Sequence, residues 1–230
     1  MSDIYTGIEN LEAMKQAVNY NAHLERLVRS HARGKRVLDF GAGAGTFAKP
    51  LQASGKQVVC LEPDAALRGE LEKLGLETCA DLEQIPAGSM DYIYSLNVLE
   101  HIEDDVLAIE RLYERLRPAG HLLLYVPAFG VLFSAMDRQV GHFRRYRRPE
   151  LIALLRQAGF VIDEARYVDS LGFFATLAYK LLGDTSGSIN VRSLSLYDRF
   201  VFPISRIVDR IIAGSFGKNL LLAAHRPPAS

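Results

Sequence analysis

Short apolar runs alternate with amphipathic segments over the first part of the chain. Five runs have the length and the β-branched or aromatic content of buried strands: 35–40, 57–62, 76–80, 90–96 and 121–127. Helical spacing of apolar residues marks segments between these runs, among them 64–74 and 104–116. This alternation predicts βαβ units, and therefore a parallel, doubly wound sheet with right-handed crossovers.

The two ends of the chain differ from this regular middle. Residues 8–32 carry apolar positions at helical spacing and predict a helix. Near the other end, a helix is predicted over 149–158, and strands over 159–168 and 219–226. The stretch 170–217 lies between these two strands and is rich in aromatic residues and arginine, so we interpret it as an insertion.

Composition limits the class of protein. The 230 residues hold 27 Lys and Arg against 27 Asp and Glu, and 49% of them are hydrophobic. These values fit a globular domain that needs no disulfide or metal staple, and we assign no metal ligands. Zero net charge argues against a nucleic-acid binder that works through bulk electrostatics. Cys60 and Cys79 lie in apolar runs and are expected to be buried, reduced thiols.

Targeting signals are not evident in the sequence. The first residues include Asp3, Glu9 and Glu12 and lack the apolar core of a secretory signal. No stretch reaches the roughly 18 uninterrupted apolar residues of a transmembrane helix. We therefore expect a cytoplasmic protein.

A glycine cluster follows the first predicted strand. Asp39 leads into the loop GAGAG at 41–45, and a helix is expected after the turn. Glycines at such a turn let the backbone approach a ligand closely. Glu62 ends the next strand, where a carboxylate can accept hydrogen bonds from both hydroxyls of an adenosine ribose. The loop and the acid together predict a nucleoside cofactor.

Two cofactor classes share this pattern, and two residues separate them. A dinucleotide fingerprint needs a third glycine where this chain has Thr46. Asp39 would repel a pyrophosphate, but it would suit a cofactor that carries an ammonium group. S-adenosylmethionine has such a group at its amino-acid end, beside a sulfonium. The alternatives are a nicotinamide-dependent oxidoreductase and a tight turn with no ligand.

With these motifs the sequence resembles the class I S-adenosylmethionine-dependent methyltransferases, over roughly 35–127 and more loosely beyond. VLDFGAGAGTF is similar to the first motif of that family, and LEPD and CADLEQIP are similar to its second and third motifs. SLNVLEHIEDD and LRPAGHLLLYVP resemble the segments around the fourth and fifth strands. Five motifs in this order are specific for the family, but not for the substrate.

The resemblance implies an α/β fold with a three-layer, doubly wound, Rossmann-like sheet of seven strands, the last one antiparallel. It divides a single domain into four parts: an N-terminal helical lid (1–34), a cofactor-binding core (35–168), a helical insertion that covers the substrate (170–217) and a last strand with the tail (218–230).

The resemblance also implies the cofactor contacts. The residues concerned are Tyr20, Asp39, Gly41, Ala42, Gly43, Glu62, Pro63, Asp64, Asp81, Leu82, Asn97 and Val98. Asp39 and the glycines would contact the methionine end, and Glu62 would hold the ribose hydroxyls. Asp81 would accept a hydrogen bond from the adenine amino group. Tyr20 is a candidate lid contact, although it could equally be an ordinary polar position on an amphipathic helix.

Four side chains are candidates for the chemistry. Methyl transfer to a hydroxyl needs alignment of the nucleophile and removal of a proton. His101, Asp137 and His142 are the candidate bases, with Tyr146 beside them in the acceptor pocket. A structural role at a helix start is an equal alternative for His101.

The segment 136–148 has the most unusual composition in the chain, with five arginines and one acid. Its pattern D-x-x-x-G-H-x-R-R-Y resembles a subgroup of bacterial methyltransferases associated with polysaccharide, lipid or secondary-metabolite pathways. We expect Arg144 and Arg145 to bind a phosphate or carboxylate of the acceptor. The alternative is a solvated basic helix start, with one arginine paired to Asp137.

The insertion contains apolar stripes at helical spacing, one of which is formed by Phe200, Ile204, Ile207, Val208 and Ile211. We expect the stripes to cover the pocket or to pack on the sheet, since such stripes usually face a core. A dimer face and a helix at a lipid interface are the alternatives.

The favoured function is methylation of a small-molecule or glycan/lipid-type acceptor, at oxygen, with S-adenosylmethionine as cofactor and S-adenosylhomocysteine as product. A nicotinamide-dependent oxidoreductase and a non-catalytic S-adenosylmethionine-binding protein are the alternatives. Expected partners are that acceptor, of anionic character, and, as open alternatives, a membrane surface or a second copy of the chain. Nucleic acid is not expected.

Overall fold

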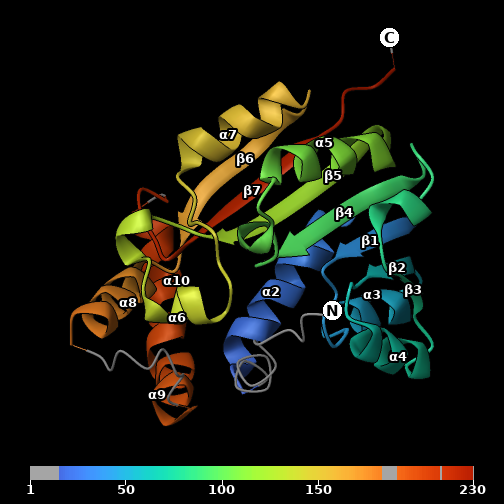
Figure 1. Ribbon diagram of the computed structural model, residues 1–230. Helices are drawn as coiled ribbons and strands as arrows, with labels where there is room; N and C mark the ends of the chain where they lie inside the picture. Colours follow the sequence, from blue (N-terminus) through green and yellow to red (C-terminus); the bar gives the residue numbers. More distant parts are fainter. Residues whose placement is uncertain (1–15, 183–190, 213, 230) are drawn as a thin grey trace.

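Seven strands form one sheet in the order β3-β2-β1-β4-β5-β7-β6 (Figure 1). The computed structural model describes residues 16–182, 191–212 and 214–229. The strands are β1 (Arg36–Phe40), β2 (Gln57–Leu61), β3 (Glu77–Cys79), β4 (Met90–Leu96), β5 (Leu116–Pro127), β6 (Val161–Val168) and β7 (Asn219–His225). Strand β7 runs antiparallel to both of its neighbours, and the other pairs are parallel. The predicted doubly wound sheet with an antiparallel last strand is confirmed.

Helices cover both faces of this sheet and gather beyond one end of it (Figure 1). The α-helices are α2 (Val18–His31), α3 (Ala48–Ala53), α4 (Ala65–Lys73), α5 (Asp105–Arg115), α6 (Ala135–Gln139), α7 (Arg148–Gln157), α8 (Ser170–Leu182), α9 (Val191–Leu196) and α10 (Phe202–Ile211). Short 3₁₀ turns are η1 (Leu82–Gln84), η2 (Leu99–His101) and η3 (Gly130–Leu132), and a π-helical turn, η4 (Tyr197–Val201), joins α9 to α10.

Side chains along the central strands alternate between two hydrophobic cores, one on each face of the sheet. Leu122 and Leu124 of β5 pack with Ile109 of α5 on one face, whereas Leu123 packs with Val28 of α2 on the other. All five side chains are buried. Each such side chain contributes about 1.5 to 3 kcal/mol on burial, so the pattern of the strand dictates the layers.

Several element boundaries differ from the predicted ones. The described part of the N-terminal helix begins at Val18, so most of the predicted lid before it lies outside the described residues. Strand β5 begins at Leu116 rather than at residue 121. Helix α5 is not a continuation of η2. The Asp104 side chain accepts a hydrogen bond from the Leu107 N–H at 2.9 Å and caps the start of α5.

Buried carboxylates tie the insertion to the rest of the fold. Asp198 of η4 accepts hydrogen bonds from the backbone N–H groups of Asn19 and Tyr20, at 2.9 and 2.8 Å. It thereby satisfies free donors at the start of α2. Asp169, buried between β6 and α8, accepts hydrogen bonds from the hydroxyls of Tyr197 and Ser205. The N-terminal helix and the insertion are therefore linked.

One of the two positions predicted for the apolar stripe of α10, packing on the sheet, is wrong. Four of its members, Phe200, Ile204, Ile207 and Ile211, are more than half exposed instead of packing on the sheet. The opposite side of the helix, with Phe202 and Ser205, is the side that is buried. Within the described ranges, no helix is long and apolar enough to cross a membrane.

Candidate active site

The glycine loop after β1 has the shape of a ligand cradle. The N–H groups of Gly41 and Ala42 both donate to the carbonyl of Leu61, at 2.9 and 3.0 Å. Gly41 has φ of +83°, and a Cβ atom there would lie 2.4 Å from Cγ2 of Val98. Position 41 therefore requires glycine for both its backbone conformation and its close packing. Around Gly43, by contrast, an added Cβ atom would meet nothing within 4 Å.

Asp39 places a buried carboxylate next to this loop. Only 3% of the residue is exposed, and Oδ2 accepts no hydrogen bond of normal geometry from the described residues. Burial raises the pKa of Asp39 to about 7, and the negative charge of Glu62 adds to the shift. The nearby Tyr94 hydroxyl favours the charged form but offsets only part of the cost of burial, so this side chain suits a cationic ligand.

Glu62 closes the other side of the loop. Its Oε2 accepts a hydrogen bond from the Gly43 N–H at 2.8 Å, and its Oε1 accepts one from the Asp64 N–H at 3.0 Å. A carboxylate has about four acceptor positions, so capacity remains for two ribose hydroxyls. The sequence did not reveal that Glu62 also fixes the glycine loop itself.

The residues predicted to surround adenine lie at the starts of α4 and η1, which follow β2 and β3. Asp64 caps α4 by accepting hydrogen bonds from Ala66 and Leu67, and Pro63 precedes it. Asp81 caps η1 by accepting a hydrogen bond from Glu83 at 2.9 Å. The N–H of Leu82 occupies the first position of η1, where helical N–H groups lack partners within the helix. Contact of these groups with adenine stays a prediction.

Tyr20 reaches the end of β4 from helix α2. Its side chain hydrogen-bonds Asn97 and Tyr125, and its ring packs edge-on against Phe202 of α10, with 5.4 Å between centroids. Burial raises the pKa of Tyr20 to about 12, so the hydroxyl stays protonated at neutral pH. Asn97 adopts φ of +55° and donates its N–H to the Tyr125 carbonyl at 2.7 Å. Helix α2 thus lies beside the predicted methionine end.

The residues around the loop fit S-adenosylmethionine. Asp39 offers the ammonium a buried carboxylate whose Oδ2 has no partner of normal geometry among the described residues. Gly41 and Gly43 allow close backbone approach, and Glu62 retains acceptor capacity. The carboxylate of Asp39 would oppose a pyrophosphate, so the arrangement disfavours a dinucleotide.

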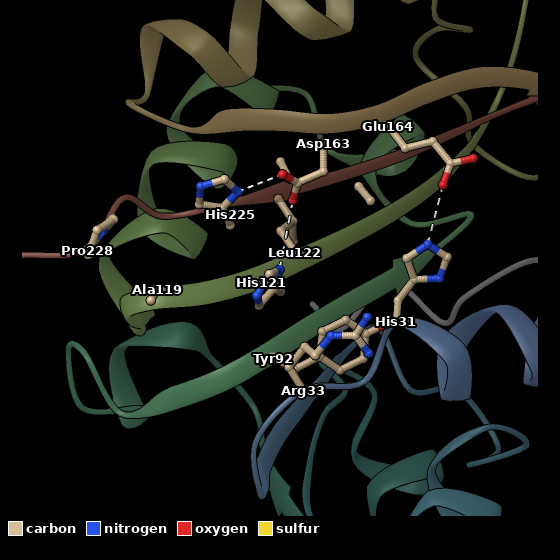
Figure 2. A pocket seen from close by; sticks show the side chains of 12 residues that line it. His31, Arg33, Tyr92, Ala119, His121, Leu122, Asp163, Glu164, His225 and Pro228 are labelled. Atoms are coloured by element: carbon tan, nitrogen blue, oxygen red, sulfur yellow. Dashed lines mark hydrogen bonds and ion pairs between the residues drawn. The ribbon is translucent and has the colours of Figure 1, made fainter.

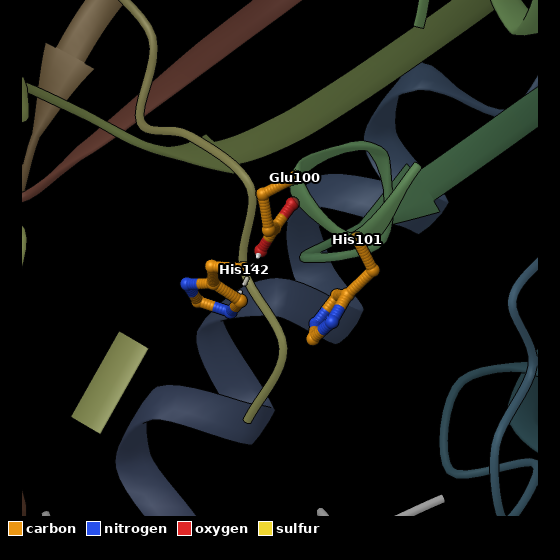
Figure 3. A group of neighbouring side chains, drawn as sticks. All are labelled: Glu100, His101 and His142. Carbon is orange, nitrogen blue, oxygen red and sulfur yellow. Dashed lines mark ion pairs between the residues drawn. The ribbon is translucent and has the colours of Figure 1, made fainter. Parts of the chain in front are cut away.

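Two of the predicted bases meet a third group that the sequence reasoning missed (Figure 3). His101 of η2 and His142 after α6 pack edge-on, with 4.5 Å between ring centroids. Nε2 of His142 lies 3.8 Å from Oε1 of Glu100, whose side chain is fully buried. Burial raises the pKa of Glu100 to about 8 and lowers that of His101 to about 4. The signal in the sequence was the acid beside His101 in the segment VLEHI.

Asp137 and Arg145 form a buried ion pair, which changes the predicted role of both. Nε and Nη2 of Arg145 donate to the two oxygens of Asp137, at 2.9 and 3.0 Å, and both residues are buried. Ser134 and His142 donate to the same carboxylate. Burial alone would raise the pKa of Asp137, but these donors hold it well below its usual range. Arg145 is therefore paired within the protein, and Asp137 has the contacts of a structural residue.

Arg144 and Tyr146 are also committed to contacts within the protein. Nη1 of Arg144 lies 2.6 Å from Oδ1 of Asp105, and its Nη2 donates to the Glu103 carbonyl. The Tyr146 hydroxyl donates to Oδ2 of Asp105 at 2.8 Å, and its ring lies in the core. Both guanidinium groups are thus paired within the protein, Arg145 in the interior and Arg144 at about one-third exposure, which does not favour the predicted anion site. Binding of an anionic acceptor by these arginines stays a prediction. Tyr146 is a core residue rather than a pocket wall.

A cavity of about 530 Å³ lies at the opposite end of the sheet (Figure 2). Its lining includes His121, where β5 pairs with β4, and His225, the last residue of β7. His225 bonds Oδ1 of Asp163 at 2.7 Å. Ligands of doubly wound sheets bind at the carboxyl ends of the parallel strands, where the glycine loop is, so this cavity is not the cofactor site.

Comparisons with known proteins agree with this geometry. The family model described as "Methyltransferase domain" matches residues 12–165. A ubiquinone biosynthesis O-methyltransferase of Xanthomonas axonopodis pv. citri is 26% identical over 159 residues, which span 59% of this chain and 66% of that protein. One of Bradyrhizobium diazoefficiens is 33% identical over 110 residues, 44% of each chain. The matched part thus spans less than two thirds of these relatives.

Proteins of known structure share this fold. An S-adenosylmethionine-dependent methyltransferase from Archaeoglobus fulgidus superimposes on this chain with a TM-score of 0.62 and 15% sequence identity. The superposition covers 91% of this chain and 94% of that one. The chain belongs to the methyltransferase domain family, in its class I, S-adenosylmethionine-dependent form. The predicted family is confirmed, and the oxidoreductase alternative is set aside.

Proposed function

We propose that this protein transfers the methyl group of S-adenosylmethionine to an oxygen atom of a small-molecule or glycan/lipid-type acceptor. The observation that carries the proposal is the buried carboxylate of Asp39 beside a glycine loop, whose Oδ2 has no hydrogen-bond partner of normal geometry among the described residues. Asp39 would hold the ammonium of the cofactor, and Glu62 would hold the ribose hydroxyls. When bound, the cofactor supplies a methyl group activated by a sulfonium.

Two observations support oxygen as the acceptor atom. The two curated relatives described above are named as O-methyltransferases. A hydroxyl must also lose its proton during transfer, and His101 and His142 lie together in the segments that follow β4 and α6. Imidazole groups can accept such a proton. Because Arg144 and Arg145 are already paired, they give no support to an anionic acceptor.

A binding and turnover experiment tests this function. Isothermal titration of the full chain should show one site each for S-adenosylmethionine and S-adenosylhomocysteine. Transfer of a labelled methyl group should then be measured over a panel of phenols, sugars, amines and thiols, with the highest turnover expected for hydroxyl acceptors. Preferred methylation of an amine or thiol would overturn the choice of oxygen. Lack of cofactor binding by native protein at millimolar concentration would overturn the proposal as a whole.

One control separates the remaining alternatives. NADH fluorescence should not change on addition of the protein, because Asp39 opposes a pyrophosphate. Glu62→Ala should weaken binding of both S-adenosyl ligands, while Glu164→Ala, at the distant cavity, should leave it unchanged. Cofactor binding without turnover on any acceptor would favour a non-catalytic protein.

A further inference from the structure

Three potential metal ligands converge next to the proposed cofactor site. One donor atom each from Glu100, His101 and His142 lies within 4.8 Å of the other two. Glu100 and His101 come from η2 and His142 from the loop after α6, so the fold brings together residues about forty positions apart (Figure 3). Ligands around one metal ion lie about 3 to 4 Å apart, given bonds near 2.1 Å, so small side-chain rotations would close the set.

Both imidazoles are oriented in the way that metal ligands usually are. Nδ1 of His142 bonds Oδ1 of Asp137 at 2.8 Å, which leaves its Nε2 pointing toward Glu100. The His101 ring hydrogen-bonds the backbone carbonyls of Val140 and Gly141. Histidine ligands commonly bond a carboxylate or carbonyl through their other nitrogen, which fixes the ring and the tautomer. The Asp137–Arg145 pair, which is not suited to catalysis, would support the site in this way.

Glu100 is the independent observation that points to a cation. Its side chain is fully buried, and neither carboxylate oxygen has a hydrogen-bond partner of normal geometry in the described part of the chain. Burying a carboxylate without hydrogen-bond partners is unfavourable in free energy. A positive ion between Glu100 and the two imidazoles would remove that cost.

We propose that Glu100, His101 and His142 bind one divalent transition-metal ion of the zinc, manganese or iron type. Two nitrogen ligands and one carboxylate suit these metals, and a three-ligand set leaves coordination positions open. The inference rests on the proposed function and deepens it: the two imidazoles would act as metal ligands rather than as proton acceptors, and an acceptor hydroxyl bound at an open position would have its pKa lowered. Its proton would pass to water, the new O–CH₃ bond would form, and the S–CH₃ bond would break with its electron pair left on sulfur.

Metal content and titration test the site without reference to activity. Protein stripped with a chelator should bind one equivalent of Zn²⁺ or Mn²⁺ by isothermal titration, confirmed by elemental analysis. Glu100→Gln and His142→Asn should each weaken binding at least tenfold. His121→Asn is the matched control, because His121 belongs to a similar histidine–carboxylate group at the distant cavity, and it should not change binding. Urea unfolding of each variant checks that it is folded.

The outcomes separate this inference from the proposed function. Failure of stripped wild-type protein to bind either metal, or equal binding by the Glu100→Gln and His121→Asn variants, would overturn the metal site. If S-adenosylmethionine still binds in that case, the proposed function stands and the cluster acts through its imidazoles alone. If neither metal nor cofactor binds, both proposals fall.

A second inference rests on a different surface, the exposed apolar face of α9, η4 and α10. The face consists of Leu196, Phe200, Ile204, Ile207 and Ile211, with exposed fractions of 60, 57, 55, 60 and 78%. The members are three or four positions apart and so lie on one side of the helix. None of the described residues shields these side chains from solvent.

Positive charge accompanies this apolar face. Arg199 and Arg210 are exposed, and Arg206 lies between them in α10. Burial lowers the pKa of Arg206, the charges of Arg26 and Arg210 lower it further, and that of Asp209 raises it. The acids of the same segment point inward: Asp198 caps α2, and Asp209 accepts hydrogen bonds from the N–H groups of Asp169 and Ser170.

We infer that this face docks on an anionic lipid surface. Exposed isoleucine and phenylalanine can enter the boundary of the acyl chains, while flanking arginines bind the headgroups. Such docking would bring the proposed site close to a lipid-borne acceptor. A second copy of the chain is the competing occupant, but the arginines beside the face would repel their counterparts across a symmetric contact.

Vesicle binding tests the lipid surface. The protein should co-sediment with vesicles containing anionic phosphatidylglycerol and not with neutral phosphatidylcholine vesicles. Ile207→Glu together with Ile211→Glu should abolish binding, and Arg199→Gln or Arg210→Gln should each weaken it roughly fivefold. Leu107→Glu, at an exposed apolar position on α5, is the matched control and should bind normally. Failure to bind anionic vesicles, or a dimer in gel filtration that Ile207→Glu converts to monomer, would overturn the inference.

Discussion

Two buried aspartates, Asp137 and Asp39, have opposite surroundings, which suit a structural role for the first and a ligand-binding role for the second. Asp137 accepts hydrogen bonds from Ser134, His142 and Arg145, whereas Oδ2 of Asp39 has no partner of normal geometry in the described structure. The pKa of Asp137 is held well below its usual range, but that of Asp39 is raised to about 7. The first carboxylate is satisfied within the protein, and the second is left for a ligand.

The comparison teaches that burial of an acid does not identify its role. The number of hydrogen-bond donors around the acid is what indicates its role, because a ligand adds little stabilisation to a carboxylate that already has a complete set of donors. By this criterion Asp39 and Glu100 are the proposed binding groups, and Asp137 is the proposed supporting one.

Asp137→Asn should give the largest loss of stability. It leaves the Arg145 guanidinium buried without its counter-charge, which typically costs about 3 to 5 kcal/mol in the free energy of unfolding. Urea denaturation measures the loss. The double variant Asp137→Leu/Arg145→Met should recover part of it, since no charge then remains unpaired. A stable Asp137→Asn protein that had lost only turnover would instead restore Asp137 as a catalytic candidate.

Asp39→Asn should act on the ligand rather than on the fold. Loss of the charge should weaken binding of S-adenosylmethionine about 30-fold or more, roughly 2 kcal/mol, as for other buried charge pairs. Stability should stay equal or rise, because the costly burial of a carboxylate is removed. Calorimetry and urea unfolding measure the two effects. Asp163→Asn, at the distant cavity, is the control, and equal weakening by both variants would contradict the assignment.

The pH dependence of cofactor binding should report the same carboxylate. Because an ammonium prefers the ionised form of Asp39, affinity should rise up to about tenfold per pH unit as pH increases toward 7, and level off above it. The raised pKa has the opposite effect on the free protein: Asp39 should lower stability as pH rises from about 4 to 7. The Asp39→Asn variant should lack both trends, and a wild-type affinity that is flat over this range would refute the role of Asp39.

Arg144→Gln should have the smallest effect. Its partner Asp105 retains a hydrogen bond from Tyr146, and Arg144 is about one-third exposed, so the loss should be about 1 kcal/mol or less. The KM for the acceptor should not change, since the arginine is engaged within the protein. A large rise in KM at constant stability would revive the predicted anion site.

Local patterns in the sequence were sufficient to predict the sheet and the glycine turn after β1. Strand alternation around Leu122 to Leu124, the glycines at 41–45 and the acid at position 62 each act over a few residues, so their structural consequences could be predicted directly. The same holds for the two cysteines, which are free thiols as predicted, with Cys60 buried and Cys79 partly so.

Pairing over long distances in the sequence could not be predicted in this way. The arginines of 136–148 form an obvious basic segment, yet their partners lie elsewhere: Asp105 for Arg144, and Asp137 by a bidentate geometry for Arg145. The helical stripe of α10 likewise predicts one apolar face, but periodicity alone does not say whether that face meets the sheet or the solvent.

The alternation of strands and helices and the class of cofactor could therefore be predicted from the sequence alone, because they depend on local spacing and side-chain chemistry. Only the tertiary structure decided which charges are neutralised and which remain open. The outcome depends on which residues the fold brings together. It places Arg145 against Asp137 and His142 near Glu100, but it gives Oδ2 of Asp39 no donor of normal geometry among the described residues.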